Sequence, residues 1–347
     1  MRNLLTTFTL GALLAPALPA GAQVYPDRIR SVTRAVEVRT RVERYQGSSQ
    51  REAQTERITK TVRIGATGEL EISNISGDIV ITRGGGSEVT IEAVKTGRGR
   101  TAEQSKQALE LVDVEIVERG DRVEVRARYP RSGGRGSREF SASVAFTIAA
   151  PERVRISANS ISGDISVKDI KGDLSLETIS GDVSIANAGR VSKASTASGD
   201  VEILDTTIEG AMDASTISGT MLLRGVKARR LDVGSVSGDV VLQDVQSERI
   251  DAQSISGNVR LSGPLVRGGR YDLGSHSGDV RVTISGDIGF ELDASSFSGN
   301  IRTDLDIKTS GTEPASRGRR RSLSGTYGDG SAFLDLTTFS GSVIIGR

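Results

Sequence analysis

A short pattern of polar and apolar positions returns along most of the chain, and each copy carries a glycine at the same place. The copy at Ser160–Val167 reads Ser-Ile-Ser-Gly-Asp-Ile-Ser-Val. The repeat glycines of the ten copies are Gly77, Gly163, Gly181, Gly199, Gly219, Gly238, Gly257, Gly278, Gly299 and Gly341. From Gly163 to Gly299 they are 18 to 21 residues apart. The last interval, of 42 residues, fits two periods whose middle copy has been lost.

Positions within a copy are counted here from its repeat glycine. The residues at minus seven and minus five are apolar in nearly every copy, and apolar residues return at plus two and plus four. Side chains alternate between the two faces of a strand, so these positions should face a core while minus six faces outward. The minus-six position is often acidic, as in Asp213, Asp232, Asp251, Asp272, Asp293 and Asp335. Each copy therefore predicts a strand, a turn and a second strand.

Repeats of this length with period-two strands are typical of solenoids, in which each coil adds one rung to continuous sheets. About five inward apolar side chains per coil contribute ~2 kcal/mol each, whereas ordering ~20 residues costs on the order of 30 kcal/mol. A single coil is thus unstable until neighbours cover it. We predict an all-β fold, a parallel β-helix or β-solenoid of 18–21 residues per coil, right-handed by the usual crossover rule.

The N-terminus has the features of a secretory signal peptide over residues 1–22. Arg2 gives the positive start, Leu4–Leu14 the apolar core, and Ala20–Ala22 the small residues of a cleavage site. The apolar run is too short to span a ~30 Å hydrocarbon core. We expect the mature chain to have no transmembrane segment and to be exported to the periplasm, the cell surface or the exterior.

Three further segments follow the signal peptide. Residues 23–59 form a polar leader, which we expect to be partly ordered, with an exposed strand as the alternative. Residues 60–150 form an N-terminal β-rich portion with one helix at about 101–111, opened by the capping pattern Thr101–Gln104. Residues 151–347 hold the uninterrupted repeats, and a basic loop at about 310–330, containing Arg317–Arg321, replaces the lost copy.

Composition narrows the possible functions. The chain has no cysteine, which excludes disulfides, thiol nucleophiles and thiolate metal sites. It has 45 Lys and Arg against 44 Asp and Glu, so its net charge gives no reason to expect nucleic acid as a partner. Aromatic residues make up 3% and tryptophan is absent, which weakens any aromatic platform for sugars.

The Ser-Gly-Asp segment is the first candidate for chemistry. Carboxylates repeated on stacked coils could bind calcium, which stays open as an alternative. We favour a structural corner in which glycine takes a positive φ and the aspartate accepts a hydrogen bond from its own turn, and we predict no cofactor. The Ser and Thr residues at minus three could be nucleophiles only beside a base, but His276 is the single histidine. Their hydroxyls should form hydrogen bonds between rungs.

The minus-two position is the second candidate, because it is apolar in almost every copy although the alternation predicts that it points outward. We favour a bend that turns this column into the core. The alternative is an exposed apolar stripe along the solenoid that binds a partner. The candidate stripe residues are Ile161, Ile179, Ile217, Val236, Ile255, His276, Phe297 and Phe339.

The Asn74–Ile79 copy, the Ala/Glu/Gln-rich helix and the serial Ser-Gly-Asp copies after Pro151 together resemble a family of exported bacterial proteins named "putative adhesin", a domain of unknown function. The resemblance covers roughly residues 57–347. It implies a β-helical fold and a cell-envelope location, and it brings no catalytic residues. We predict a non-catalytic adhesin or scaffold that presents an elongated face to a glycan or protein partner, in an oligomeric state that the sequence does not indicate.

A polysaccharide-acting enzyme, a lyase or hydrolase on the same scaffold, is the alternative. Its only support is the acidic minus-six column, because glycosidic chemistry needs carboxyl groups ~5 to 9 Å apart and adjacent rungs lie ~4.8 Å apart.

Overall fold

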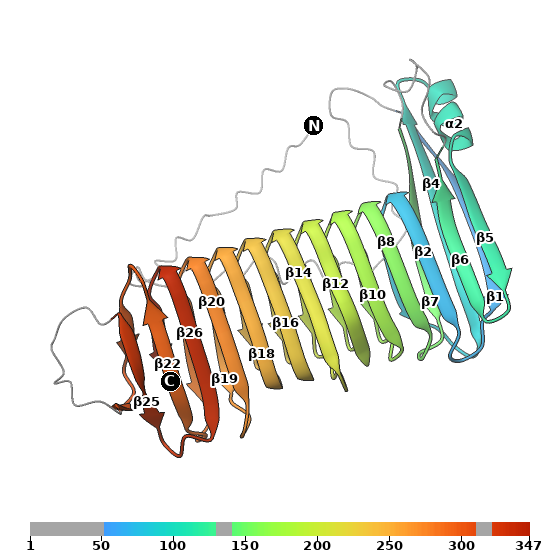
Figure 1. Ribbon diagram of the computed structural model, residues 1–347. Helices are drawn as coiled ribbons and strands as arrows, with labels where there is room; N and C mark the ends of the chain where they lie inside the picture. Colours follow the sequence, from blue (N-terminus) through green and yellow to red (C-terminus); the bar gives the residue numbers. More distant parts are fainter. Residues whose placement is uncertain (1–51, 130–140, 310–320) are drawn as a thin grey trace, which may run out of the picture. The chain divides into compact units, whose positions relative to one another are not determined.

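The structure, a computed structural model, describes residues 52–129, 141–309 and 321–347. The predicted signal peptide, most of the leader and Arg317–Arg320 lie outside the described residues. Within them the chain is almost entirely β, in two long mixed sheets (Figure 1). This agrees with the predicted all-β class, while the right-handed path stays a prediction.

We call the two sheets sheet A and sheet B. Sheet A has the order β1 (Glu52–Arg63), β4 (Glu88–Gly99), β7 (Ser141–Ala150), β3 (Ile79–Arg83), β9 (Ile165–Lys168), β11 (Val183–Ala186), β13 (Val201–Leu204), β15 (Met221–Arg224), β17 (Val240–Gln243), β19 (Val259–Pro264), β21 (Val280–Ser285), β27 (Val343–Gly346) and β23 (Ile301–Thr303). Sheet B has the order β24 (Lys308–Thr309), β25 (Ser322–Tyr327), β22 (Phe290–Ser296), β26 (Ala332–Ser340), β20 (Arg270–Ser277), β18 (Gln246–Ser256), β16 (Lys227–Ser237), β14 (Ala211–Ser218), β12 (Arg190–Ser198), β10 (Asp173–Ser180), β8 (Arg155–Ser162), β2 (Glu69–Ser76), β6 (Arg122–Arg128) and β5 (Asp113–Arg119).

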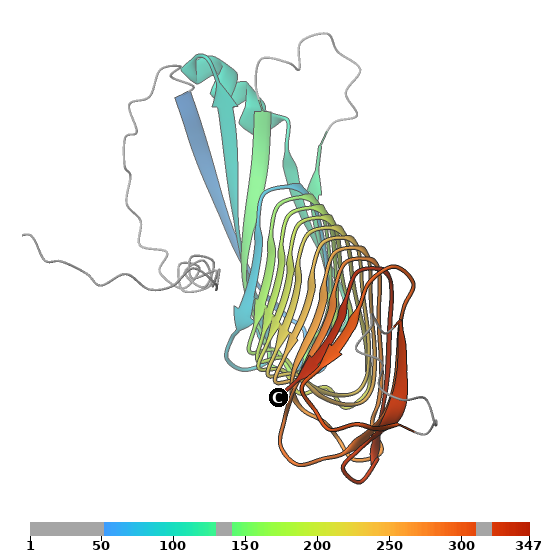
Figure 2. The same cartoon turned by 90° about the vertical axis from the view of Figure 1, so that its left-hand side faces the viewer.

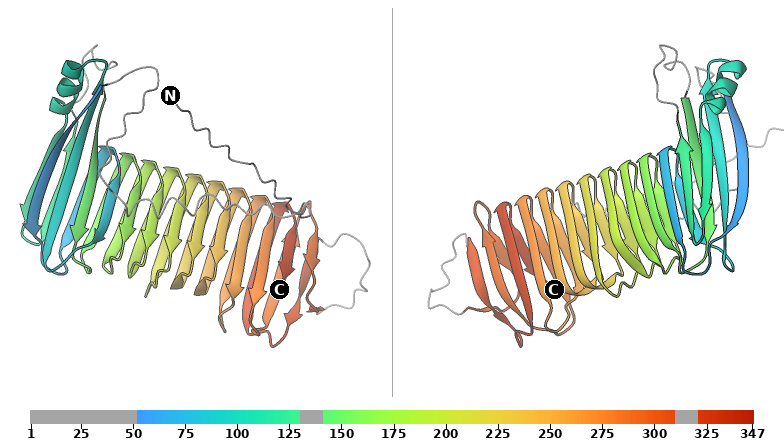
Figure 3. Two further views of the ribbon diagram at one scale, coloured as in Figure 1. Left: turned by 180° about the vertical axis from the view of Figure 1, so that it is seen from behind. Right: turned by 45° about the vertical axis from the view of Figure 1, so that its right-hand side comes forward.

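Each copy of the repeat gives one strand to sheet B before its glycine and one to sheet A after it. Neighbouring copies pair in parallel and in register, so Leu174 lies opposite Ile156 in sheet B and Val183 lies opposite Ile165 in sheet A. The view along the stack shows the coils lying over one another (Figure 2), and the view from behind shows the same rows of strands (Figure 3). The apolar positions at minus seven, minus five, plus two and plus four are buried in one continuous core, as the alternation predicts.

The N-terminal portion is part of this stack. The first copy, β2 and β3, pairs directly with β8 and β9, so residues 84–150 are an insertion between the first and second coils. The insertion adds two strands to sheet A: β7 pairs in parallel with β3, and β4 pairs antiparallel with β7. It also adds the β5–β6 hairpin to sheet B. The residues before and after position 151 share one core. The last residues of the leader belong to β1, which begins at Glu52 and pairs along its whole length with β4.

The predicted helix is present as α2 (Ala102–Glu110). The Thr101 hydroxyl accepts a hydrogen bond from the Gln104 backbone N–H at 3.3 Å, and the Gln104 side chain accepts one from the Arg100 N–H at 2.9 Å. Both bonds satisfy donors at the helix start. Helix α2 has nine residues, too few to span a bilayer. None of the described residues form a helix that is long and apolar enough to cross a membrane.

The C-terminal coil is inserted into the stack, one place before its end. Strand β26 lies between β20 and β22, and β27 lies between β21 and β23. The last coil is therefore not an open edge that needs a partner. The stretch that replaces the lost copy is also more than a loop, because β24 and β25 pair antiparallel beside β22 and end sheet B.

Close approach of the preceding backbone requires glycine at these corners, and seven of the ten repeat glycines also have a positive φ. At Gly181 φ is +147°, and a Cβ there would lie 2.3 Å from the Gly163 carbonyl oxygen of the preceding coil. The predicted partner of the following aspartate is wrong: the carboxylate accepts the N–H of the next coil, as Asp164 does from Asp182 at 2.9 Å. Because neighbouring corners are in backbone contact, the backbone N–H that reaches the carboxylate belongs to the next rung.

The minus-three hydroxyls form hydrogen bonds between rungs, as predicted. The Oγ1 of Thr196 donates to the Gly181 carbonyl at 2.9 Å, and the Oγ of Ser254 donates to the Gly238 carbonyl at 2.9 Å. Among the described residues, Ser160 Oγ is a buried exception without a partner. The corresponding carbonyl, that of Gly77, accepts instead from the Asn74 side chain at 2.7 Å.

Candidate functional site

The minus-two column faces solvent. The structure exposes nine large hydrophobic side chains among its described residues, and all but Leu111 belong to this column. Ile217 is 57% exposed and Phe297 64% exposed. The favoured bend into the core is therefore wrong, because the strand alternation continues past the buried minus-three residue. All eight candidates lie on the outer face of sheet B: Ile161, Ile179, Ile217, Val236, Ile255, His276, Phe297 and Phe339.

In-register pairing aligns these side chains in one stripe along sheet B. Strand β12 lies between β10 and β14 and carries Ala197 at this position, so a small side chain separates Ile179 from Ile217. At one end the rings of His276 and Phe339 stack with centroids 4.9 Å apart and planes 8° apart. The ring of Phe297 stacks on the other face of Phe339 at 4.6 Å. The Phe339 ring thus has a ring on each face, whereas Phe297 has this one ring neighbour among the described residues.

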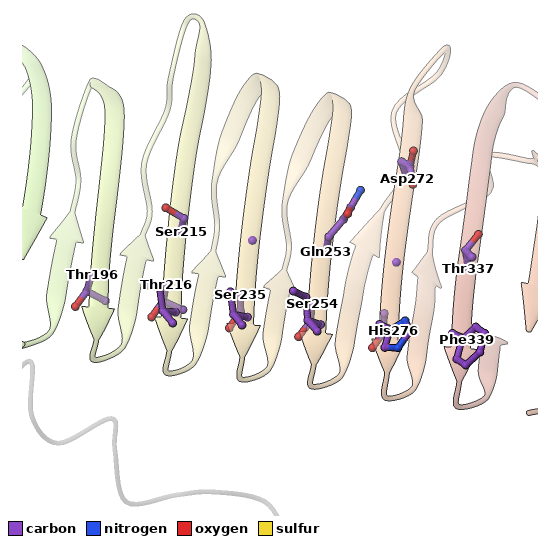
Figure 4. A pocket seen from close by; sticks show the side chains of 16 residues that line it. Thr196, Ser215, Thr216, Ser235, Gln253, Ser254, Asp272, His276, Thr337 and Phe339 are labelled. Carbon is purple, nitrogen blue, oxygen red and sulfur yellow. The ribbon is translucent and has the colours of Figure 1, made fainter. Parts of the chain in front are cut away.

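A shallow groove of about 650 Å³ runs beside the stripe, across strands β12 to β26. Its floor is formed by the residues at minus four, of which Ser215, Gly234 and Gly274 are small and Gln253 and Thr337 are larger. Its apolar wall contains Ile217, Val236, Ile255, His276 and Phe339. Figure 4 shows His276 and Phe339 side by side, Ser215, Gln253 and Thr337 further along their strands, and Asp272 beyond them.

On the side opposite the stripe, sheet B carries a column of aspartates at minus six, which we call the acidic wall. The minus-six aspartates stand in register, Asp232 opposite Asp251, Asp251 opposite Asp272, and Asp272 opposite Asp335. Burial raises the pKa of Asp272, and the neighbouring Asp335 and Asp251 raise it further. Asp272 itself lines the groove.

Arginines two residues before the aspartates, on the same face of sheet B, balance only part of this acidic charge. Arg230 pairs with Asp232 at 2.8 Å. Arg270 instead lies 4.8 Å from the centre of the Phe333 ring. The Asp251 carboxylate accepts a hydrogen bond from the Gln253 amide at 3.0 Å, which leaves its charge in place.

The groove has the features of a binding surface. The hydroxyls at minus three are held by the carbonyls of the preceding rung, and the His276 ring stacks on Phe339. Within the described ranges, no group of three or more His, Asp or Glu side chains is arranged to hold a metal ion. The arrangement can bury apolar surface and attract positive charge.

Sequence reasoning offered the stripe only as the alternative to a bend, and it missed the groove. The signal was present at minus four, where Ser195, Ser215, Gly234 and Gly274 are small. Between the outward positions at minus six and minus two, these small residues lower the surface, although Gln253 interrupts them between Gly234 and Gly274. Reading all three outward columns together would have predicted a hollow with one acidic and one apolar side.

Comparisons with solved structures gave similar chains with low identity. A "putative adhesin" from Bacteroides fragilis NCTC 9343 is 12% identical with a TM-score of 0.40, and the match covers 84% of this chain and 97% of that one. A "putative lipid binding protein" from Parabacteroides distasonis ATCC 8503 is 13% identical with a TM-score of 0.40, covering 84% and 96%. No curated protein matches the chain. The model of the Toastrack DUF4097 family matches residues 67–345, and the chain belongs to that family.

Proposed function

We propose that this protein is a non-catalytic, exported component of the cell envelope, an adhesin or scaffold that presents the outer face of sheet B to a partner. It acts without a cofactor and does not bind nucleic acid. The glycan or protein partner is recognised by the stripe and the groove beside it.

The observation that carries this proposal is the exposed stripe. Soluble proteins rarely leave large contiguous apolar patches uncovered unless the patch binds something. Here eight of the nine exposed large hydrophobic side chains of the described residues lie in one column. Parallel pairing on both sides of each strand holds that column at a fixed spacing. Since a rigid surface loses little conformational freedom on binding, such a stripe suits display.

The test compares residues 23–347 with the Ile217→Asp/Ile255→Asp variant. Both are labelled and incubated with the envelope fraction of the producing cells, and bound protein is measured by sedimentation. Saturable binding by the original chain that falls at least about tenfold in the variant supports the proposal, because two half-exposed isoleucines would lose their apolar contacts. Equal binding by the two proteins contradicts it.

A second assay tests the enzymatic alternative, which the in-register aspartates keep open. The chain is incubated with a panel of cell-wall and capsular glycans, and reducing ends and unsaturated products are measured. Turnover that is lost in Asp251→Asn or Asp272→Asn would replace the scaffold proposal with the enzyme. Binding without turnover supports the scaffold.

A further inference from the structure

We propose that the groove on sheet B binds an amphipathic α-helix of a partner protein, with basic side chains along one side and apolar side chains along the other. This inference rests on the proposed function and names the class of ligand. It follows from the width, the length and the two unlike walls of the groove.

The width fits a helix. The acidic wall at minus six and the apolar wall at minus two are four residues apart along each strand, which is ~13 Å at about 3.3 Å per residue. An α-helix with its side chains is ~10–12 Å across. A helix lying along the groove can therefore touch both walls at once.

The length suits a helix of ordinary size. The residues that line the groove come from β12, β14, β16, β18, β20 and β26. Five strand spacings of about 4.8 Å give a groove of ~24 Å, which accommodates ~16 helical residues at 1.5 Å per residue. Apolar residues three and four apart on such a helix would lie against the stripe, as in other helix-in-groove complexes.

Charge selects the opposite side of the helix. The acidic wall stacks Asp232, Asp251, Asp272 and Asp335 without an intervening cation in the column. A row of Lys or Arg on the bound helix would relieve this repulsion, because each cation lies between neighbouring carboxylates.

Stacking makes the Phe339 ring unsuited to a sugar. Sugars are bound against the open faces of aromatic rings, but the Phe339 ring has His276 on one face and Phe297 on the other. The edges of these rings and the flanking Val236 and Ile255 form an apolar ridge. Such a ridge packs between the side chains of a helix.

The test uses three synthetic 16-residue peptides and residues 23–347 of the chain. The first peptide is made of leucine and lysine spaced for an amphipathic helix, the second has the same composition with strict alternation for a strand, and the third is the helical pattern with glutamate in place of lysine. Binding is measured by fluorescence anisotropy at physiological salt. We expect the basic helical peptide to bind at least about tenfold more tightly than either control.

Two variants locate the binding. Gly234→Gln/Gly274→Gln fills the floor, where a Cβ at Gly234 has no atom within 4 Å and the fold should be kept. Asp251→Asn/Asp272→Asn removes charge from the acidic wall. Each should weaken the basic helical peptide at least about tenfold, with an unchanged melting temperature or a higher one confirming the fold. Val241→Gln on the outer face of sheet A is the matched control and should bind as the original chain does.

Three results would overturn the inference. Equal binding of the helical and alternating basic peptides would mean charge attraction without a fitted groove. Binding that neither groove variant changes would place the peptide elsewhere. A dimer in analytical ultracentrifugation that is lost in Ile217→Ser/Ile255→Ser would make a second copy the occupant. If the basic helical peptide does not bind while binding to the envelope fraction still depends on Ile217 and Ile255, the inference is wrong, but the proposed function stands with a different class of ligand.

Discussion

The rings of Phe297 and Phe339 lie nearly parallel with centroids 4.6 Å apart, although 42 residues separate them in the chain. They meet because β26 is inserted between β20 and β22 and pairs in parallel with both. The insertion completes the stripe, since it places Phe339 between His276 and Phe297. The C-terminal coil thus contributes both to the core and to the surface that we propose for binding.

Replacing a repeat glycine should destabilise the stack. Gly181→Ala adds a Cβ 2.3 Å from the Gly163 carbonyl oxygen at a φ of +147°. The backbone conformation costs about 1–3 kcal/mol, and the clash adds to it. Gly210→Ala is the control, because its Cβ meets no atom within 4 Å. Urea unfolding should show a clear loss only for Gly181→Ala, and equal midpoints for the two variants would refute the role of the close approach.

The minus-three hydroxyls allow a paired comparison. Ser254→Ala removes a bond of 2.9 Å to the Gly238 carbonyl and should lower the free energy of unfolding by about 1 kcal/mol. Ser160→Ala removes a buried hydroxyl that has no partner among the described residues, so it should cost nothing or stabilise. Equilibrium denaturation measures both. A larger loss for Ser160→Ala than for Ser254→Ala would contradict the hydrogen-bond pattern.

Asp272 should make the protein less stable as its carboxyl ionises. Burial, then Asp335 and Asp251, raise its pKa in the folded state, while Arg270 opposes them. The penalty is fully present above the folded-state pKa and is absent below the ordinary pKa of an unfolded aspartate, about 3.9. Asp272→Asn should therefore raise the melting temperature at pH 7, and the gain should vanish as the pH falls through that window.

Asp213→Asn is the control for this pH series, because Lys193 lies opposite Asp213 on one side of the column. It should not raise the melting temperature at pH 7. A gain of the same size in both variants would show that the acidic stack around Asp272 is not its source.

Calcium should not change the melting temperature. The corner carboxylates already accept N–H groups of the next coil, as Asp200 does from Thr220 at 2.7 Å and Asp279 does from Ser342 at 2.7 Å. Differential scanning fluorimetry with EDTA and with added calcium measures this. A midpoint that rises with calcium and falls with EDTA would restore the calcium alternative.

The periodic parts of the fold could be predicted from sequence because each column repeats one physical requirement. Positions such as Leu174 and Val183 alternate with polar neighbours, and the alternation alone places them in the core. Gly163 and its counterparts predict a corner. Their second role is to let the backbone of the previous coil come close. That contact exists only between stacked coils, so the sequence of one copy does not reveal it.

The parts that could not be predicted depend on strand order. Nothing in the spacing of Gly299 and Gly341 indicates that the later coil is placed before the earlier one, because both fit the same repeat. The first copy at Gly77 is likewise separated from its spatial neighbour Gly163 by an insertion of two sheet extensions and a helix. The minus-two column was expected in the core because apolar residues are usually buried. It is exposed because this position lies on the outward face of each strand.

The central claim is that the stripe is surface and not core, and one measurement tests it most directly. The free energy of unfolding is measured by urea titration for Ile217→Asp/Ile255→Asp and for Ile250→Asp, whose side chain is 0% exposed in the same strand as Ile255. We predict a change within about 1 kcal/mol per site for the stripe variant and loss of the cooperative transition for Ile250→Asp. Loss of the transition in the stripe variant as well would contradict the account.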